Sequence, residues 1–83
     1  MDRMPQFGDN EVKVLQAVRR SAMDGYSLLS TTGLKPQDLV DALVKLEGLI
    51  NIKGELIEGR IGEAYVALPP NNRHFVDQVL AAK

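Results

Sequence analysis

Side chains that could carry acid–base, nucleophilic or metal chemistry are few in this sequence and widely separated. His74 is the only histidine, and the chain has no cysteine. A catalytic or zinc site needs several such groups at ligand spacing, and no such spacing is evident around His74. The stretch Ser30-Thr31-Thr32-Gly33 lacks the glycines and the lysine of a phosphate-binding loop, and the acidic residues in 51–68 follow no calcium-loop pattern. We therefore expect neither an enzyme nor a bound metal or cofactor.

The polar residues best suited to a binding role lie between positions 35 and 60. Gln37 could pair with the edge of an adenine, and Lys35 and Lys45 could neutralise backbone phosphates. Arg60 lies in a glycine-flanked turn, where it could reach a phosphate or the minor groove, or could be an ordinary solvated charge. These four residues are the candidates for a contact with double-stranded DNA.

The charge balance around these candidates opposes tight binding to nucleic acid. Residues 35–50 carry two cations against three anions: Lys35 and Lys45 against Asp38, Asp41 and Glu47. Residues 51–68 repeat that balance: Lys53 and Arg60 against Glu55, Glu58 and Glu63. The whole chain has a net charge of −1, whereas phosphate binding depends on clustered Lys and Arg. Any affinity for DNA is expected to be weak or to depend on conditions.

Two helices joined by a tight turn are predicted to position these residues. Asp24 can accept from the first amides of a short helix that carries Leu28 and Leu29, and Gly33 ends that helix because glycine enters the left-handed region without a steric penalty. Pro36 suits the first position of the next helix, and Gly48 is its natural end. The buried face of that helix is predicted to comprise Leu39, Ala42, Leu43 and Leu46.

The flanking segments predict one helix before this pair, and a hairpin and a helix after it. A helix over about residues 10–23, with Asp9 as its N-cap, has an apolar stripe at helical spacing that comprises Val12, Val14, Leu15, Val18 and Ala22. Alternating residues in 50–56 and 63–68, separated by the turn 59–62, predict a two-stranded β-hairpin. Asn71 or Asn72 can cap a last helix over about 71–82. We expect a loose leader over residues 1–8 and a single domain over 9–83, mainly α with a two-stranded hairpin (α+β).

The chain resembles the winged helix-turn-helix domains of prokaryotic transcription regulators over about Asp9 to Leu68. The residues that carry the resemblance are Leu28, Thr32-Gly33-Leu34, Leu39, Ala42-Leu43, Leu46-Glu47 and Gly48-Leu49-Ile50. The resemblance implies a three-helix core, a recognition helix from Pro36, a wing over 51–68 that carries Arg60, and DNA binding in transcription regulation. The sequence departs from the family at Asp41, where DNA-binding members often carry Arg, Lys or a polar residue, and at Val40, where a serine-like residue is common. Glu47 and Gly48 are adjacent, whereas the family usually places two residues between them.

Apolar residues on two helices favour a second function, that of a protein-interaction or dimerisation module. Val40 and Val44 lie one helical turn apart and point away from the leucine face, or else line the edge of the core if the helix is slightly rotated. The last helix has an apolar face that comprises Phe75, Val76, Val79 and Leu80. This face could pack on the first helix of the same chain, or against a second copy in a homodimer. No segment reads as a secretory signal or a membrane span, so a cytoplasmic location is expected.

Overall fold

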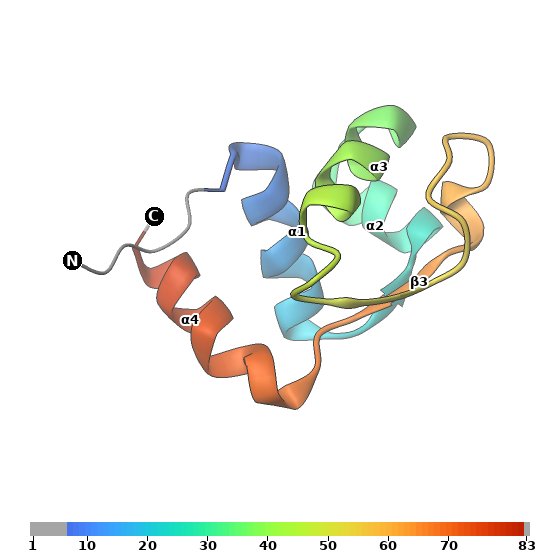
Figure 1. The fold of residues 1–83 in the computed structure, drawn as a ribbon. Coiled ribbons are helices and arrows are strands. Elements are labelled where there is room, and N and C mark those ends of the chain that lie inside the picture. The colour runs from blue at the N-terminus through green and yellow to red at the C-terminus, as the bar shows by residue number, and fades with distance from the viewer. Residues whose placement is uncertain (1–6, 83) are drawn as a thin grey trace.

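The computed structural model describes residues 7–82 of the 83-residue chain, and this part is mainly helical with a small antiparallel sheet (Figure 1). The helices are α1 (Asp9–Arg20), α2 (Gly25–Thr32), α3 (Pro36–Lys45) and α4 (Arg73–Ala81). The strands are β1 (Met23–Asp24), β2 (Asn51–Lys53) and β3 (Tyr65–Ala67), and short 3-10 turns cover Ile61–Glu63 and Pro70–Asn72. Most of the predicted leader, residues 1–6, lies outside the described residues.

The sheet has three strands in the order β1-β3-β2, and both pairings are antiparallel. The predicted hairpin is present as β2 and β3, with Ile52 opposite Val66. The prediction of only two strands is wrong, because Met23 pairs with Val66 on the other edge of β3. The chain leaves α1 at Ser21, which is extended at φ −166° and ψ 151°. The next residues can therefore form backbone hydrogen bonds with β3 instead of continuing the helix to position 23.

The start of α1 also differs from the prediction. Gly8, and not Asp9, is the N-cap, and its backbone N–H donates to Glu11 Oε1 at 2.6 Å. The Glu11 carboxylate thus satisfies one of the amides that precede the first helical hydrogen bond. Val12, Val14, Leu15 and Val18 are buried as expected, whereas Ala22 lies beyond the helix and is exposed.

The turn between α2 and α3 is built as predicted. The Asp24 carboxylate accepts from the Tyr26 and Ser27 amides at 3.1 and 3.4 Å and from the Ser27 hydroxyl at 2.7 Å. Gly33 has φ 73°, in the left-handed region, and Pro36 is the first residue of α3. The predicted end of α3 is wrong, because the helix stops at Lys45, three residues before Gly48.

One apolar core holds the helices and the sheet together. Its largest fully buried side chains come from all four helices, from β3 and from the segments that precede β2 and β3: Val14, Leu15, Leu28, Leu39, Leu43, Leu46, Ile61, Val66 and Val76. A two-point contact between the guanidinium of Arg19 and the carboxylate of Asp77, at 2.5 and 3.2 Å, joins α1 to α4. This contact lowers the pKa of Asp77, because Arg19 donates its hydrogen bonds to the ionised carboxylate.

The Asp24 cap makes part of the stability depend on pH. The hydrogen bond from the Ser27 hydroxyl, supported by the Ser27 and Tyr26 amides, lowers the pKa of Asp24 below its ordinary value. A depressed pKa stabilises the folded state above about pH 4, where the unfolded carboxyl is already ionised, and this contribution is lost as the pH falls through the folded-state pKa. We therefore expect the stability advantage of the wild type over Asp24→Asn to shrink as the pH falls from about 4 to 2.

Urea unfolding of the two proteins across this range measures the advantage. Asp77 contributes equally to both proteins and cancels in the difference. A stability difference that stays constant from neutral pH to about pH 2 would show that the ionised Asp24 carboxylate does not cap α2.

Candidate functional site

The outer face of α3 carries few groups that are free to contact DNA. The Gln37 Nε2 atom donates to Asp41 Oδ1 at 2.9 Å, so the amide that was expected to read an adenine is already paired with a carboxylate. Val44 is half exposed on this face. Val40 is only 6% exposed and belongs to the core with Leu39 and Leu43, so of the two predicted alternatives the one in which it lines the core holds for Val40 and not for Val44. The apolar stripe of α3 is wide enough to include Val40.

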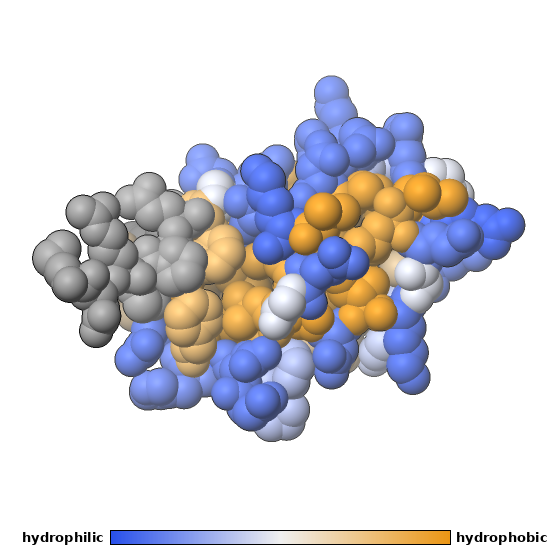
Figure 2. All heavy atoms as spheres, viewed as in Figure 1, coloured by the Kyte–Doolittle hydropathy of each residue, from blue (hydrophilic) through white to orange (hydrophobic). Residues whose placement is uncertain are grey.

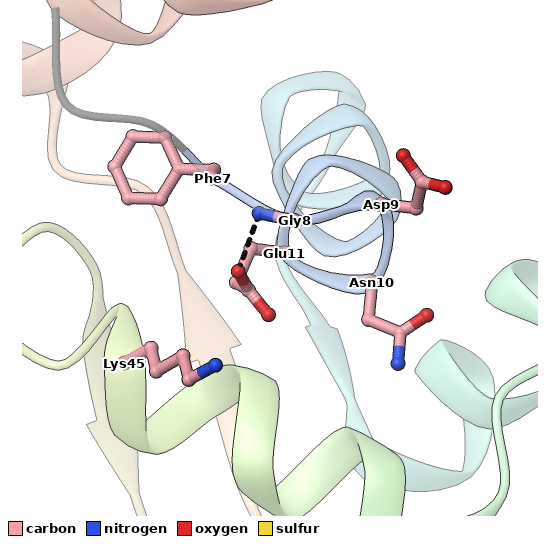
Figure 3. Close-up of a pocket in the computed structure, with 6 residues that line it drawn as sticks. All are labelled: Phe7, Gly8, Asp9, Asn10, Glu11 and Lys45. Atoms are coloured by element: carbon pink, nitrogen blue, oxygen red, sulfur yellow. Dashed lines mark hydrogen bonds between the residues drawn. The ribbon is translucent and has the colours of Figure 1, made fainter.

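Lys45 lies away from that outer face. In Figure 3 its side chain reaches from α3 toward Glu11 in the first turn of α1. Between the two helices is a hollow of about 650 Å³ lined by Phe7, Gly8, Asp9, Asn10, Glu11 and Lys45. Among the described lining residues two carboxylates, Asp9 and Glu11, stand against the single cation Lys45, a balance that does not favour a phosphate.

Arg60 is exposed in the long connection between β2 and β3, and carboxylates flank it. Its Nε atom lies 3.7 Å from Glu55 Oε1, and its Nη1 atom lies 3.9 Å from Glu63 Oε1. The chain turns where predicted, with turn residues at 58–60 followed by the 3-10 turn Ile61–Glu63, although Ile61 and Gly62 are buried. Of the four DNA candidates, Lys35 and Lys45 have no ion pair among residues 7–82, and Lys35 lies exposed just before α3.

Apolar side chains gather on the face formed by the end of α3 and the segment that follows it, as Figure 2 shows. The apolar residues in this part of the chain that keep exposed surface are Val44, Leu49, Ile52, Leu56 and Ile57, which we call the α3–loop surface. Val44 is 50% exposed and Ile57 is 53% exposed. The exposed charged residues in the same stretch are four acidic ones and three basic ones: Asp41, Glu47, Glu55 and Glu58, and Lys45, Lys53 and Arg60. The surface therefore combines exposed apolar side chains with mixed charges in which the acidic residues slightly predominate.

The apolar face of α4 is used largely within the chain. Val76 and Val79 are buried at 0% and 4% exposure, and α4 packs against α1. Phe75 and Leu80 are partly buried against the same core. Val76 and Val79 therefore pack within the monomer, which was one of the two predicted alternatives. These two side chains leave no exposed surface for a second copy.

The predicted asparagine cap of α4 is wrong. Asn72 occupies the N-cap position, but its side chain does not bond the first amides of the helix. Instead its Nδ2 atom donates to the carbonyl oxygen of Leu49 at 2.8 Å. This bond ties the start of α4 to the segment that follows α3.

Residues suited to chemistry do not converge in the described part of the chain. His74 is exposed on α4, with its Nε2 atom 3.2 Å from Gln78 Nε2. Within residues 7–82, no three His, Asp or Glu side chains lie where they could hold a metal ion together. Nor does any helix there have the length and apolar character needed to cross a membrane.

The fold brings together a second group of cations, which was not predicted from the sequence. A groove of about 270 Å³ between α1 and α2 is lined by Lys13, Gln16, Ala17, Arg20, Thr31 and Thr32. The spacing of Lys13, Gln16 and Arg20 at i, i+3 and i+7 is visible in the sequence as one side of a helix. The sequence does not show that the two threonines of α2 approach that side of α1.

Comparisons of the chain with models of known protein families, with curated proteins and with solved structures find no match.

Proposed function

We propose that the chain is a winged-helix domain that binds a protein partner through the α3–loop surface. The order of elements supports the fold part of this proposal. A short helix, a turn at Gly33 and a second helix come first, and the antiparallel pair β2–β3 follows. This is the order that the resemblance to winged helix-turn-helix domains implies. Function must then be argued from the surface, because one fold serves many functions.

The observation that carries the proposal is the exposure of two large apolar side chains, Val44 of α3 and Ile57 in the β2–β3 connection, in the part of the molecule where Figure 2 shows apolar side chains gathered. Burying apolar surface against a partner gains roughly 25 cal/mol per Å², whereas a phosphate backbone offers no apolar surface to bury it. In residues 41–60 the exposed acidic residues also outnumber the exposed cations by four to three, which does not favour phosphate binding. The partner that complements the surface presents apolar side chains flanked by Lys or Arg.

Direct DNA binding in transcription regulation is the second candidate. Lys35 favours it, since this exposed lysine precedes α3 and has no acidic partner in residues 7–82. In this mode, however, Gln37 must first break its hydrogen bond with Asp41, and Arg60 must leave its two glutamates. A protein partner is therefore a better candidate ligand for the chain than an operator sequence in DNA.

Photo-crosslinking in the source cells tests the proposal. A photoreactive residue is placed at Ile57, with the same residue at the exposed Ala81 of α4 as the matched control. We expect discrete protein adducts from position 57 that Val44→Glu abolishes, and none of the same mass from position 81. An adduct of twice the chain mass would identify a second copy as the partner. The proposal would be contradicted if no adducts formed from position 57, or if the same adducts formed from both positions.

A further inference from the structure

The groove between α1 and the end of α2 gathers hydrogen-bond donors without any acidic residue. Its lining comprises Lys13, Gln16, Ala17, Arg20, Thr31 and Thr32, and it encloses about 270 Å³. Lys13, Gln16 and Arg20 project from one side of α1, and each is exposed. Lysine, arginine and the glutamine amide together supply ten N–H donors, of which eight belong to cations.

The positive surface continues around the end of α1. Arg20 also lines two adjoining hollows of about 170 and 150 Å³, and neither of them has an acidic lining residue. The second hollow brings Arg73 of α4 close to Arg19 and Arg20. Arg19 is neutralised by Asp77, and the same carboxylate attracts Arg73, so the cations left for a ligand are chiefly Lys13 and Arg20, with Arg73 beside them. None of these three has an ion pair within the described residues.

The helix dipole explains only part of this arrangement. A cation in the last turn of α1, such as Arg20, stabilises the helix by itself. Lys13 lies near the middle of α1 and receives no such benefit, because the dipole effect falls off within the last turn. The Thr31 hydroxyl is exposed beside these side chains, whereas the Thr32 hydroxyl is occupied, donating to the Leu28 carbonyl at 2.6 Å.

We propose that this groove binds the phosphate groups of a nucleic-acid backbone. Lys13 and Arg20 each neutralise one phosphate, and Gln16 and Thr31 donate hydrogen bonds to phosphate oxygens. Seven residues of helix place the two cations about 10.5 Å apart along the axis. No group in the groove is held where it would read base edges, so the binding is independent of base sequence.

The proposal goes beyond the proposed function, because the groove shares no residue with the α3–loop surface. A chain that contacts a protein partner on one surface and phosphates on the other would bring that partner to nucleic acid.

Fluorescence anisotropy of a labelled mixed-sequence duplex with the full chain tests the proposal. Neutralising two or three phosphates predicts a slope of log K against log salt between about −2 and −3. The double variant Lys13→Gln with Arg20→Gln should weaken binding at least about tenfold at low salt and flatten the slope by about 2 units. The matched control, Lys53→Glu, changes the net charge by the same two units at an exposed position outside the groove and should weaken binding by less than about threefold. Thermal unfolding should be unchanged in both variants, since all three side chains are exposed.

Two results would overturn the proposal. Equal loss of affinity in the groove and control variants would show that binding follows net charge and not the groove. In the second, inorganic phosphate is added at the same concentration of phosphate groups as the duplex supplies. Displacement of the duplex under this condition would show that the groove binds free phosphate instead of a nucleic-acid backbone. Neither result bears on the crosslinks from position 57, so failure here is distinguishable from failure of the proposed function.

Discussion

Gly25→Ala is expected to lower the free energy of unfolding by more than about 3 kcal/mol. A Cβ atom at Gly25 would lie 1.8 Å from the carbonyl oxygen of Ile61 and 2.7 Å from its carbonyl carbon. These are backbone atoms, so no side-chain rotation relieves the clash. The Gly25 amide also donates to the Ala64 carbonyl at 2.7 Å, and moving α2 away from Ile61 would lengthen that hydrogen bond.

Urea unfolding followed by circular dichroism measures this effect. Gly48→Ala and Gly59→Ala are matched controls, because a Cβ at either position meets no atom within 4 Å and neither glycine has a positive φ. Both controls should change the stability by less than about 1 kcal/mol. If Gly25→Ala were as stable as the controls, the close packing of α2 on the segment from Ile61 to Ala64 would be refuted.

Leu43→Ala is expected to cost about 2–5 kcal/mol, whereas Val44→Ala at the next position should cost less than about 0.5 kcal/mol. Leu43 has no exposed surface, and its truncation leaves a cavity among core residues from several elements. Val44 is half exposed, so little buried volume is lost. Since a small domain has a total stability of about 5–15 kcal/mol, the Leu43 variant approaches global unfolding. Equilibrium unfolding of both variants tests whether α3 is rotated so that Leu43 is buried and Val44 is exposed. Equal losses of stability in the two variants would contradict this rotation.

The sequence predicted the elements whose signals are local. The Asp24 cap, the left-handed Gly33 and Pro36 at the start of α3 each depend on residues within one or two turns, and each is confirmed. Strand β1 was missed because its partner lies far along the chain, at Tyr65 and Val66. A two-residue strand has no alternation of its own from which it could be recognised.

The candidate site was harder to predict because it depends on which side chains meet across elements. Gln37 and Asp41 are four residues apart on α3, and their hydrogen bond follows from helical spacing. The burial of Val40 and the exposure of Val44 depend instead on the rotation of α3, which the width of the apolar stripe leaves undetermined. The position of Lys45 near Glu11 requires the packing of α3 on α1.

The central claim is that the α3–loop surface serves a protein partner and does not read DNA. Amide chemical shifts of labelled protein, recorded while a mixed-sequence duplex is added at low salt, test this claim most directly. We expect shifts at Lys13, Gln16, Arg20 and Thr31, with the amides of α3 and of residues 54–60 unchanged up to saturation. Salt-reversible shifts at Gln37, Asp41 and Arg60 would contradict the claim and place DNA on the α3–loop surface.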